Sequence, residues 1–180
     1  AAPANLSKAP HAIFYSISNT QTGLKGVSFG DSLIKRVVDT LKDEFPKLKT
    51  FVTLSPIPGL RPWLSKNAPP DLLKAWEQVH ELAANAPERA ALLSMTAQYL
   101  AREMRDGKPL DPVARFHLGN GARVERINWA GDPSTKGMKQ SYGLMVNYLY
   151  DLKRLDRHRA LLAQGKIPTA PAVGKLMPAP

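Results

Sequence analysis

Two stretches of β-forming residues enclose a helical one in the first third of the chain. Residues 12–18 alternate apolar with small polar side chains and are rich in β-forming types, which predicts a strand. Apolar residues then recur at helical spacing from Leu33 to Phe45, behind Asp31 or Ser32 as the cap, until Pro46 ends the pattern. Residues 50–54 predict a second strand. This order of elements predicts an α/β fold.

The loop between the first strand and the helix contains three glycines. Gly23, Gly26 and Gly30 allow positive φ and a close approach of the backbone. A loop with free N–H groups at a helix N-terminus attracts anions, because the unpaired donors and the helix dipole both point at it. The loop therefore suits a pyrophosphate, and an ordinary connection between strand and helix is the alternative.

Beyond residue 55 the pattern becomes helical and then alternates again. Residues 55–59 turn the chain, and 61–70 are predicted to form an irregular connection. Helical patterns start at Asp71 and Pro87, so that residues 71–106 form a helical insertion that either packs against the sheet or covers a pocket. The remaining predictions are a loop-rich stretch over 109–121 with a turn or hairpin at Asn120-Gly121, a strand over 123–130, a polar loop over 131–140, a strand over 142–150, a charged helix over 151–164 and an extended tail over 165–180.

Length and composition narrow the class of protein. A chain of 180 residues is long enough for one domain with a core. The absence of cysteine excludes disulfides, thiolate catalysis and cysteine-ligated metals. No stretch approaches the apolar length needed to span a membrane, and the N-terminus lacks the plan of a secretory signal. We therefore expect a cytoplasmic protein.

A formal net charge of +10 predicts attraction to polyanions, which leaves nucleic acid, a membrane surface or a phosphate-bearing ligand as partners. The basic residues are scattered, and the densest cluster comprises Lys153, Arg154, Arg157, His158 and Arg159. RNA-binding modules interleave aromatic residues with basic ones, and this cluster contains no aromatic residue. We expect a solvated helix face there, with nucleic-acid contact as the alternative.

Several runs of residues resemble the malonyl-CoA decarboxylase family. They follow one another without rearrangement over residues 12–150, and several contain four or more residues. The matching runs are 14–21, 23–26, 33–38, 54–59, 111–114, 116–118, 120–122, 126–129, 143–145 and 147–148.

The resemblance implies a fold similar to the GNAT acyltransferases, in which helices flank a mixed sheet that splays open to admit an acyl-CoA. Family members also carry an N-terminal helical domain and the opening strands of the sheet, so this chain resembles the C-terminal part of such an enzyme. We expect a tether or loop remnant at 1–11, the catalytic domain at 12–164 and a Pro/Ala-rich tail at 165–180. The rest of the enzyme is an expected partner, and we expect a homo-oligomer.

The resemblance also implies the site residues. By position, Ser55 matches the family's catalytic serine, His117 its catalytic histidine and Tyr150 a tyrosine that supports the pair. Asn147 is expected to be a further donor to the substrate. The loop that is similar to the family's CoA-binding loop comprises Lys25, Gly26, Val27, Ser28, Phe29, Gly30 and Asp31.

One of these positions departs from the family pattern. Animal members have a glutamate where Ser28 stands. If that acid orients the catalytic hydroxyl in those enzymes, another group must do so here.

The implied reaction converts malonyl-CoA to acetyl-CoA and CO₂ through an enolate. The thioester carbonyl is the electron sink, so neither an organic cofactor nor a metal is expected. The protein must hold the leaving carboxylate out of the thioester plane, offer donors to the enolate oxygen and protonate the carbon. His117 is the expected proton donor, because histidine alone titrates near neutrality when unperturbed. Ser55 is expected to bind the malonyl carboxylate or relay a proton, because no Gly-x-Ser-x-Gly elbow supports a nucleophile.

From the residues alone, a purely structural role remains an alternative for each of these positions. His117 could be a turn histidine, Ser55 could cap the Pro-Ile-Pro turn, and Tyr150 could be a core residue. The other three histidines fit no metal-ligand spacing and are expected on the surface or on helices: His11, His80 and His158. Lys35 and Arg36 could meet CoA phosphates or form a solvated helix face.

Two other functions remain as alternatives. One is an acyl-CoA N-acetyltransferase of the same fold, which would need an amine acceptor. The other is a non-catalytic module that binds acyl-CoA or nucleic acid, which only the charge supports. If the chain is part of a decarboxylase, we expect neither nucleic acid nor a membrane as a partner.

Overall fold

A mixed sheet is the frame of the molecule. The computed structural model describes residues 10–14 and 30–178, and for 30–36 it describes the backbone. Among these residues, four strands lie in the order β1 (His11–Phe14), β2 (Thr50–Pro56), β6 (Met145–Tyr150) and β5 (Arg123–Asn128). β1 runs parallel to β2, whereas β6 runs antiparallel to both β2 and β5. The predicted mixed sheet flanked by helices is confirmed.

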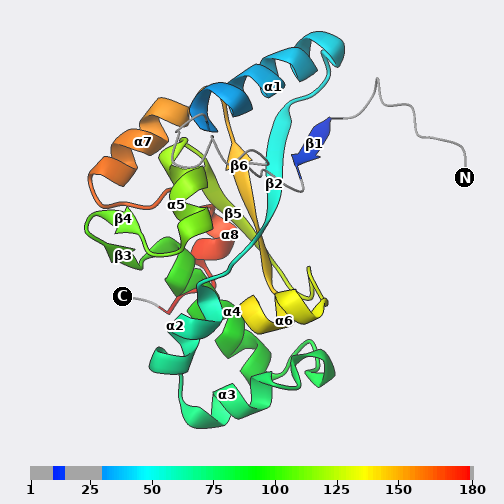
Figure 1. Ribbon diagram of the computed structural model, residues 1–180, viewed down its shortest axis with the longest axis vertical. Coiled ribbons are helices and arrows are strands. Elements are labelled where there is room, and N and C mark those ends of the chain that lie inside the picture. Colours follow the sequence, from blue (N-terminus) through cyan, green and yellow to red (C-terminus); the bar gives the residue numbers. More distant parts are fainter. Residues whose placement is uncertain (1–9, 15–29, 179–180) are drawn as a thin grey trace, which may run out of the picture.

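The helices surround the sheet on several sides. In Figure 1, α1 crosses the upper end of the strands, α5, α7 and α8 lie beside them, and α2, α3 and α6 lie at the lower end. Their bounds, with the remaining short elements, are α1 (Gly30–Glu44), α2 (Leu60–Asn67), α3 (Pro70–Trp76), the 3₁₀ turn η3 (Val79–Glu81), α4 (Pro87–Ala101), β3 (Met104–Arg105), β4 (Lys108–Pro109), α5 (Pro112–Gly119), α6 (Thr135–Ser141), α7 (Leu155–Ala163) and α8 (Pro171–Gly174).

One face of β2 and β6 is buried and carries both aromatic and hydroxyl side chains. Residues two apart on a strand point to the same face, so the antiparallel register determines which side chains meet there. The buried pairs on this face are Phe51 with Tyr150, Thr53 with Tyr148, and Ser55 with Val146. Two polar residues therefore lie within an otherwise apolar and aromatic surface.

The first strand takes an unexpected place. The chain enters the strand predicted over 12–18 directly, which indicates a central strand with neighbours on both sides. In the described sheet, however, β1 is an edge strand and pairs with β2. Residues 15–29 lie outside the described residues. Further strands beside β1 stay a prediction.

Three segments predicted to be irregular are helical instead. The loop-rich stretch contains α5, which begins at Pro112 behind an Asp111 cap. The irregular connection contains α2, and the polar loop contains α6, which Ser134 caps by accepting from the Gly137 N–H at 3.1 Å. All three are only seven or eight residues long, too short for the periodicity of apolar residues to stand out.

The insertion and the C-terminal segment both pack against the sheet. α4 contacts β5, which agrees with the packing interpretation of the insertion. The extended tail predicted beyond residue 165 is wrong in part, because Thr169 bridges Val124 of β5 and α8 follows. The Val173 side chain is buried in the core. The proline-rich composition of residues 165–180 indicated an extended chain, but tertiary contacts of a few apolar side chains hold this segment against the sheet.

Candidate active site

Ser55 and His117 meet although they lie 62 residues apart in the chain. The Ser55 Oγ atom is 3.2 Å from His117 Nε2, and both side chains are buried. Ser55 lies near the end of β2, and His117 lies in the last turn of α5. Ala114, His117 and Leu118 form the buried face of α5 because their spacing places them on one side of a helix. The sequence thus directs the imidazole toward the sheet.

The other ring nitrogen of His117 is held by Tyr150. Its Nδ1 atom lies 2.7 Å from the Tyr150 hydroxyl oxygen. Tyr148 stacks on the imidazole with ring centroids 4.6 Å apart and planes 23° from parallel. Because Tyr148 and Tyr150 lie on the same face of β6, one strand supplies both the stacking ring and the polar partner. The imidazole is therefore fixed in position and in plane.

Burial changes the acid–base behaviour of His117. It lowers the pKa of the imidazole from 6.5 to about 4, because the charged form loses hydration among aromatic side chains. The imidazole is therefore neutral at neutral pH. The pKa of His117 therefore differs from the unperturbed value on which its choice as the proton donor rests.

Asp111 holds the first turn of the helix that carries His117. Its Oδ1 atom accepts from the N–H groups of Val113 and Ala114, at 2.9 and 3.0 Å. Its Oδ2 atom accepts from the Gly59 N–H at 3.1 Å and the Tyr99 hydroxyl at 3.3 Å. Burial raises the pKa of this carboxyl, while the three N–H donors oppose that rise. Asp111 thus connects α5 to α4 and to the turn that follows Ser55.

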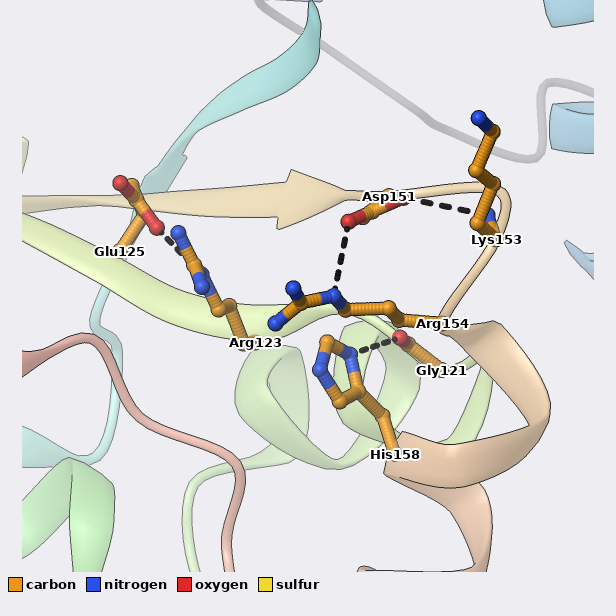
Figure 2. A network of polar contacts seen from close by, with 7 residues as sticks. All are labelled: Gly121, Arg123, Glu125, Asp151, Lys153, Arg154 and His158. Atoms are coloured by element: carbon orange, nitrogen blue, oxygen red, sulfur yellow. Dashed lines mark hydrogen bonds and ion pairs between the residues drawn. The ribbon is translucent and has the colours of Figure 1, made fainter.

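A polar network holds the other end of α5 (Figure 2). His158 of α7 donates from Nδ1 to the Gly121 carbonyl oxygen, at 2.9 Å, just after α5 ends. Gly121 has a φ of +85°, and a side chain there would strike Leu155. Close by, Arg154 pairs with Asp151 at 3.3 Å. His158 lies on a helix, as predicted, but it is buried and does not belong to the surface.

The amide of Asn147 is used within the sheet. Its Nδ2 atom donates to the Thr53 carbonyl oxygen at 2.8 Å, and its Oδ1 atom accepts from Asn128 Nδ2 at 2.8 Å. Asn147 alternates with Tyr148 along β6, so it belongs to the opposite face from the Ser55–His117 pair. The structure does not bring Asn147 to that pair, and its role toward a substrate stays a prediction.

Sequence reasoning missed three residues of this site. Thr53 accepts from the Ser55 hydroxyl at 2.9 Å, Tyr148 stacks on His117, and Asp111 anchors α5. Alternation along β2 could have found Thr53, because it shares a face with Ser55. The Asp-Pro dipeptide could have found Asp111, since it pairs a favoured cap with a favoured first helical residue.

The predicted loop of seven residues is only partly described. Lys25, Gly26, Val27, Ser28 and Phe29 lie outside the described residues. Gly30 and Asp31 lie in the first turn of α1, which begins before both expected caps, Asp31 and Ser32. Lys35 and Arg36 lie in the same helix, and their side chains are not described. The assignment of this loop stays a prediction.

Two features are absent from the residues that the structure describes. No group of three or more His, Asp or Glu side chains among them is arranged to hold a metal ion. No helix in residues 30–178 is both long and apolar enough to cross a membrane.

Comparison with known proteins gives consistent results. The family model described as Malonyl-CoA decarboxylase C-terminal domain matches residues 1–180. Mitochondrial malonyl-CoA decarboxylase of Mus musculus is 41% identical, and the match covers 79% of this chain and 35% of that protein. The chain therefore spans about a third of the length of this relative.

Solved structures agree with the sequence relatives. Malonyl-CoA decarboxylase from Rhodopseudomonas palustris has a TM-score of 0.85 and 47% identity, covering 96% of this chain and 43% of that one. The corresponding structure from Agrobacterium vitis has a TM-score of 0.84 and 44% identity, covering 96% of this chain and 46% of that one.

The contact between Gly59 and Tyr99 gives a test of how α4 is anchored. A Cβ atom on Gly59 would overlap the Tyr99 hydroxyl, so Gly59→Ala should destabilise the protein by about 1–3 kcal/mol. In a Tyr99→Phe background the same substitution should cost clearly less, because the overlapping oxygen is gone. Urea unfolding of the two single variants and the double variant measures this coupling. Equal costs in both backgrounds would contradict the close approach.

The lowered pKa of His117 predicts how stability depends on pH. Between pH 6.5 and about 4 the His117 imidazole is protonated in the unfolded chain but neutral in the folded chain. The contribution of this group to the free energy of unfolding is therefore complete above this range and is lost as the pH falls through it. The difference between the two pKa values corresponds to roughly 3 kcal/mol. His117→Gln should remove this part of the acid sensitivity, as measured by urea unfolding at several pH values.

His80→Gln is the matched control, because that imidazole lies on η3 and is exposed. It should keep the wild-type pH dependence. A His117→Gln variant that also keeps it would show that the imidazole is not a buried neutral group.

Proposed function

Because the chain belongs to the malonyl-CoA decarboxylase family, we propose that the complete enzyme converts malonyl-CoA to acetyl-CoA and CO₂, and that Ser55 and His117 act at the malonyl end. The observation that carries the proposal is the 3.2 Å approach of Ser55 Oγ to His117 Nε2, in a family whose relatives are named for this reaction. This chain supplies the C-terminal part of the enzyme.

The reaction breaks one C–C bond and consumes one proton. The electron pair of the bond to the carboxylate moves into the thioester carbonyl, which gives CO₂ and an enolate. Protonation of the enolate carbon then gives acetyl-CoA. The enzyme must hold the carboxylate out of the thioester plane so that the breaking bond overlaps the carbonyl π system. Donors to the enolate oxygen stabilise the charge by roughly 3–4 kcal/mol each, by analogy with oxyanion holes.

A neutral imidazole needs a proton before it can act as the acid, and the substrate can favour its uptake. The malonyl carboxylate beside His117 places a negative charge near the ring, which raises its pKa. His117 then holds an imidazolium while the carboxylate is present. Loss of CO₂ removes that charge, so the imidazolium becomes a stronger acid as the carbanion forms. Ser55 would bind the carboxylate or relay this proton between Nε2 and carbon.

Tyr150 would support the same cycle from the far side of the ring. Its hydroxyl can donate to Nδ1 of the neutral imidazole and accept from Nδ1–H of the imidazolium, so the 2.7 Å contact serves both states. No metal or organic cofactor enters this scheme, because the thioester is its own electron sink.

Other features of the complete enzyme stay predictions. The loop from Lys25 to Asp31 is proposed to bind CoA, with Ser28 in a position that is acidic in animal members. The likeness to GNAT acyltransferases, the missing N-terminal part as partner and homo-oligomer formation are proposed on the resemblance. A cytoplasmic location stays a prediction as well, and the mouse relative is named as mitochondrial.

Release of CO₂ from malonyl-CoA by the complete polypeptide tests the proposal. Ser55→Ala and His117→Asn should each lower kcat by about 10² or more with KM little changed, because they remove a group that acts on the transition state. His80→Asn is the matched control and should keep wild-type turnover, because it changes an exposed imidazole.

Two results would contradict the proposal. Full turnover by His117→Asn would remove the imidazole from the protonation step. Turnover only when an amine acceptor is added would identify an acyltransferase instead.

A further inference from the structure

The hydroxyl of Thr53 lies beside the candidate active site. Thr53 is almost fully buried, at 1% exposure, and shares the inner face of β2 with Ser55. Its Oγ1 atom lies 2.9 Å from Ser55 Oγ, within hydrogen-bond distance. A buried hydroxyl is costly unless it is paired, and here its partner is the serine that contacts the imidazole.

The direction of the Ser55–Thr53 hydrogen bond decides which ring nitrogen of His117 carries the proton. Ser55 has one hydroxyl proton, and if Thr53 accepts it, Ser55 Oγ can only accept from His117. The Nε2 atom must then carry the ring proton, and Nδ1 must offer its lone pair to the Tyr150 hydroxyl. In that case the four groups form a directed chain from Tyr150 through His117 and Ser55 to Thr53.

Thr53 is well placed to be a fixed acceptor. Its carbonyl oxygen accepts from Asn147 Nδ2, and Asn147 in turn accepts from Asn128, so polar bonds tie together β2, β6 and β5 at this point. Threonine is also β-branched, which restricts rotation about χ1. The Oγ1 atom is therefore presented to Ser55 from a rigid strand.

We propose that Thr53 is a positioning residue that draws the Ser55 proton away from His117 and thereby holds the neutral imidazole as the Nε2–H tautomer. In the substrate-free site the Nε2 proton therefore already lies on the Ser55 side of the ring. When the malonyl carboxylate binds, Ser55 turns its own proton from Thr53 to the carboxylate, as the proposed function requires. Without the Thr53 hydroxyl, Ser55 would donate to Nε2 and shift the ring toward the Nδ1–H tautomer. This inference rests on the proposed function for its catalytic meaning, whereas the tautomer is a separate observable.

The experiment uses the complete enzyme with [¹⁵N]histidine. Long-range ¹H–¹⁵N correlation spectra report the tautomer of each neutral imidazole, and the His117→Asn variant identifies the His117 signals. Wild type should show Nε2–H at His117. Thr53→Val, which keeps the shape of the side chain but removes the hydroxyl, should shift His117 toward Nδ1–H. The same variant should lower kcat by about 10-fold or more with KM little changed.

Two further variants separate positioning from a loss of structure. Thr53→Ser restores a hydroxyl at the same place and should recover the wild-type tautomer and most of kcat. Thr96→Val is the matched control, because Thr96 is also fully buried but donates to Leu92 within α4. It should change neither the tautomer nor kcat. Thr53→Ala removes the same hydroxyl with less bulk and replaces the valine variant if that one fails to fold.

The outcomes decide the inference without ambiguity. A wild-type tautomer at His117 in a folded Thr53→Val or Thr53→Ala protein would overturn it, whatever the activity. A shifted tautomer with unchanged kcat would overturn the link to the reaction. Failure of the proposed function would look different, because His117→Asn would then keep full CO₂ release.

Discussion

The central constraint in this structure is the confinement of one neutral imidazole. His117 has a partner at each ring nitrogen and an aromatic ring on its face, and only 4% of its surface is exposed. Each contact reduces the positions that the ring can adopt, and burial disfavours the charged form. The site therefore holds the histidine in one orientation and favours its neutral form.

The scaffold around the ring is arranged to keep this confinement. Asp111 fixes the beginning of α5, and the His158–Gly121 bond fixes the turn after its end. The strand β2 supplies Ser55 and Thr53, and its neighbour β6 supplies Tyr148 and Tyr150. Helix and sheet are held independently, so the distance between serine and histidine depends on tertiary packing rather than on any local motif. This explains why the two residues can be far apart in the chain and still share one site.

Part of this arrangement could be predicted from the sequence, and the rest could not. β-Forming residues identified positions 50–54 of β2, because strand propensity is a local property, but Ser55 was expected in the turn that follows and belongs to the strand. The helix that carries His117 was missed, since eight residues with a proline at the start and Asn-Gly behind resemble a loop. The contact between His117 and Tyr150 spans 33 residues and depends on how α5 packs on β6, so only the family resemblance indicated it. The lowered pKa of His117 could not be predicted because burial exists only in the folded chain.

The most direct test of the account is proton uptake when the carboxylate binds. Carboxyethyl-CoA has the malonyl carboxylate but a methylene in place of the thioester carbonyl, so it cannot be decarboxylated. Calorimetry in buffers of different ionisation enthalpy should show uptake of up to about one proton per site near neutral pH, because the bound carboxylate raises the pKa of His117. Propyl-CoA, which has no carboxylate, should show no such uptake, and His117→Asn should abolish it. Binding of carboxyethyl-CoA to the wild-type enzyme without proton uptake would contradict the account.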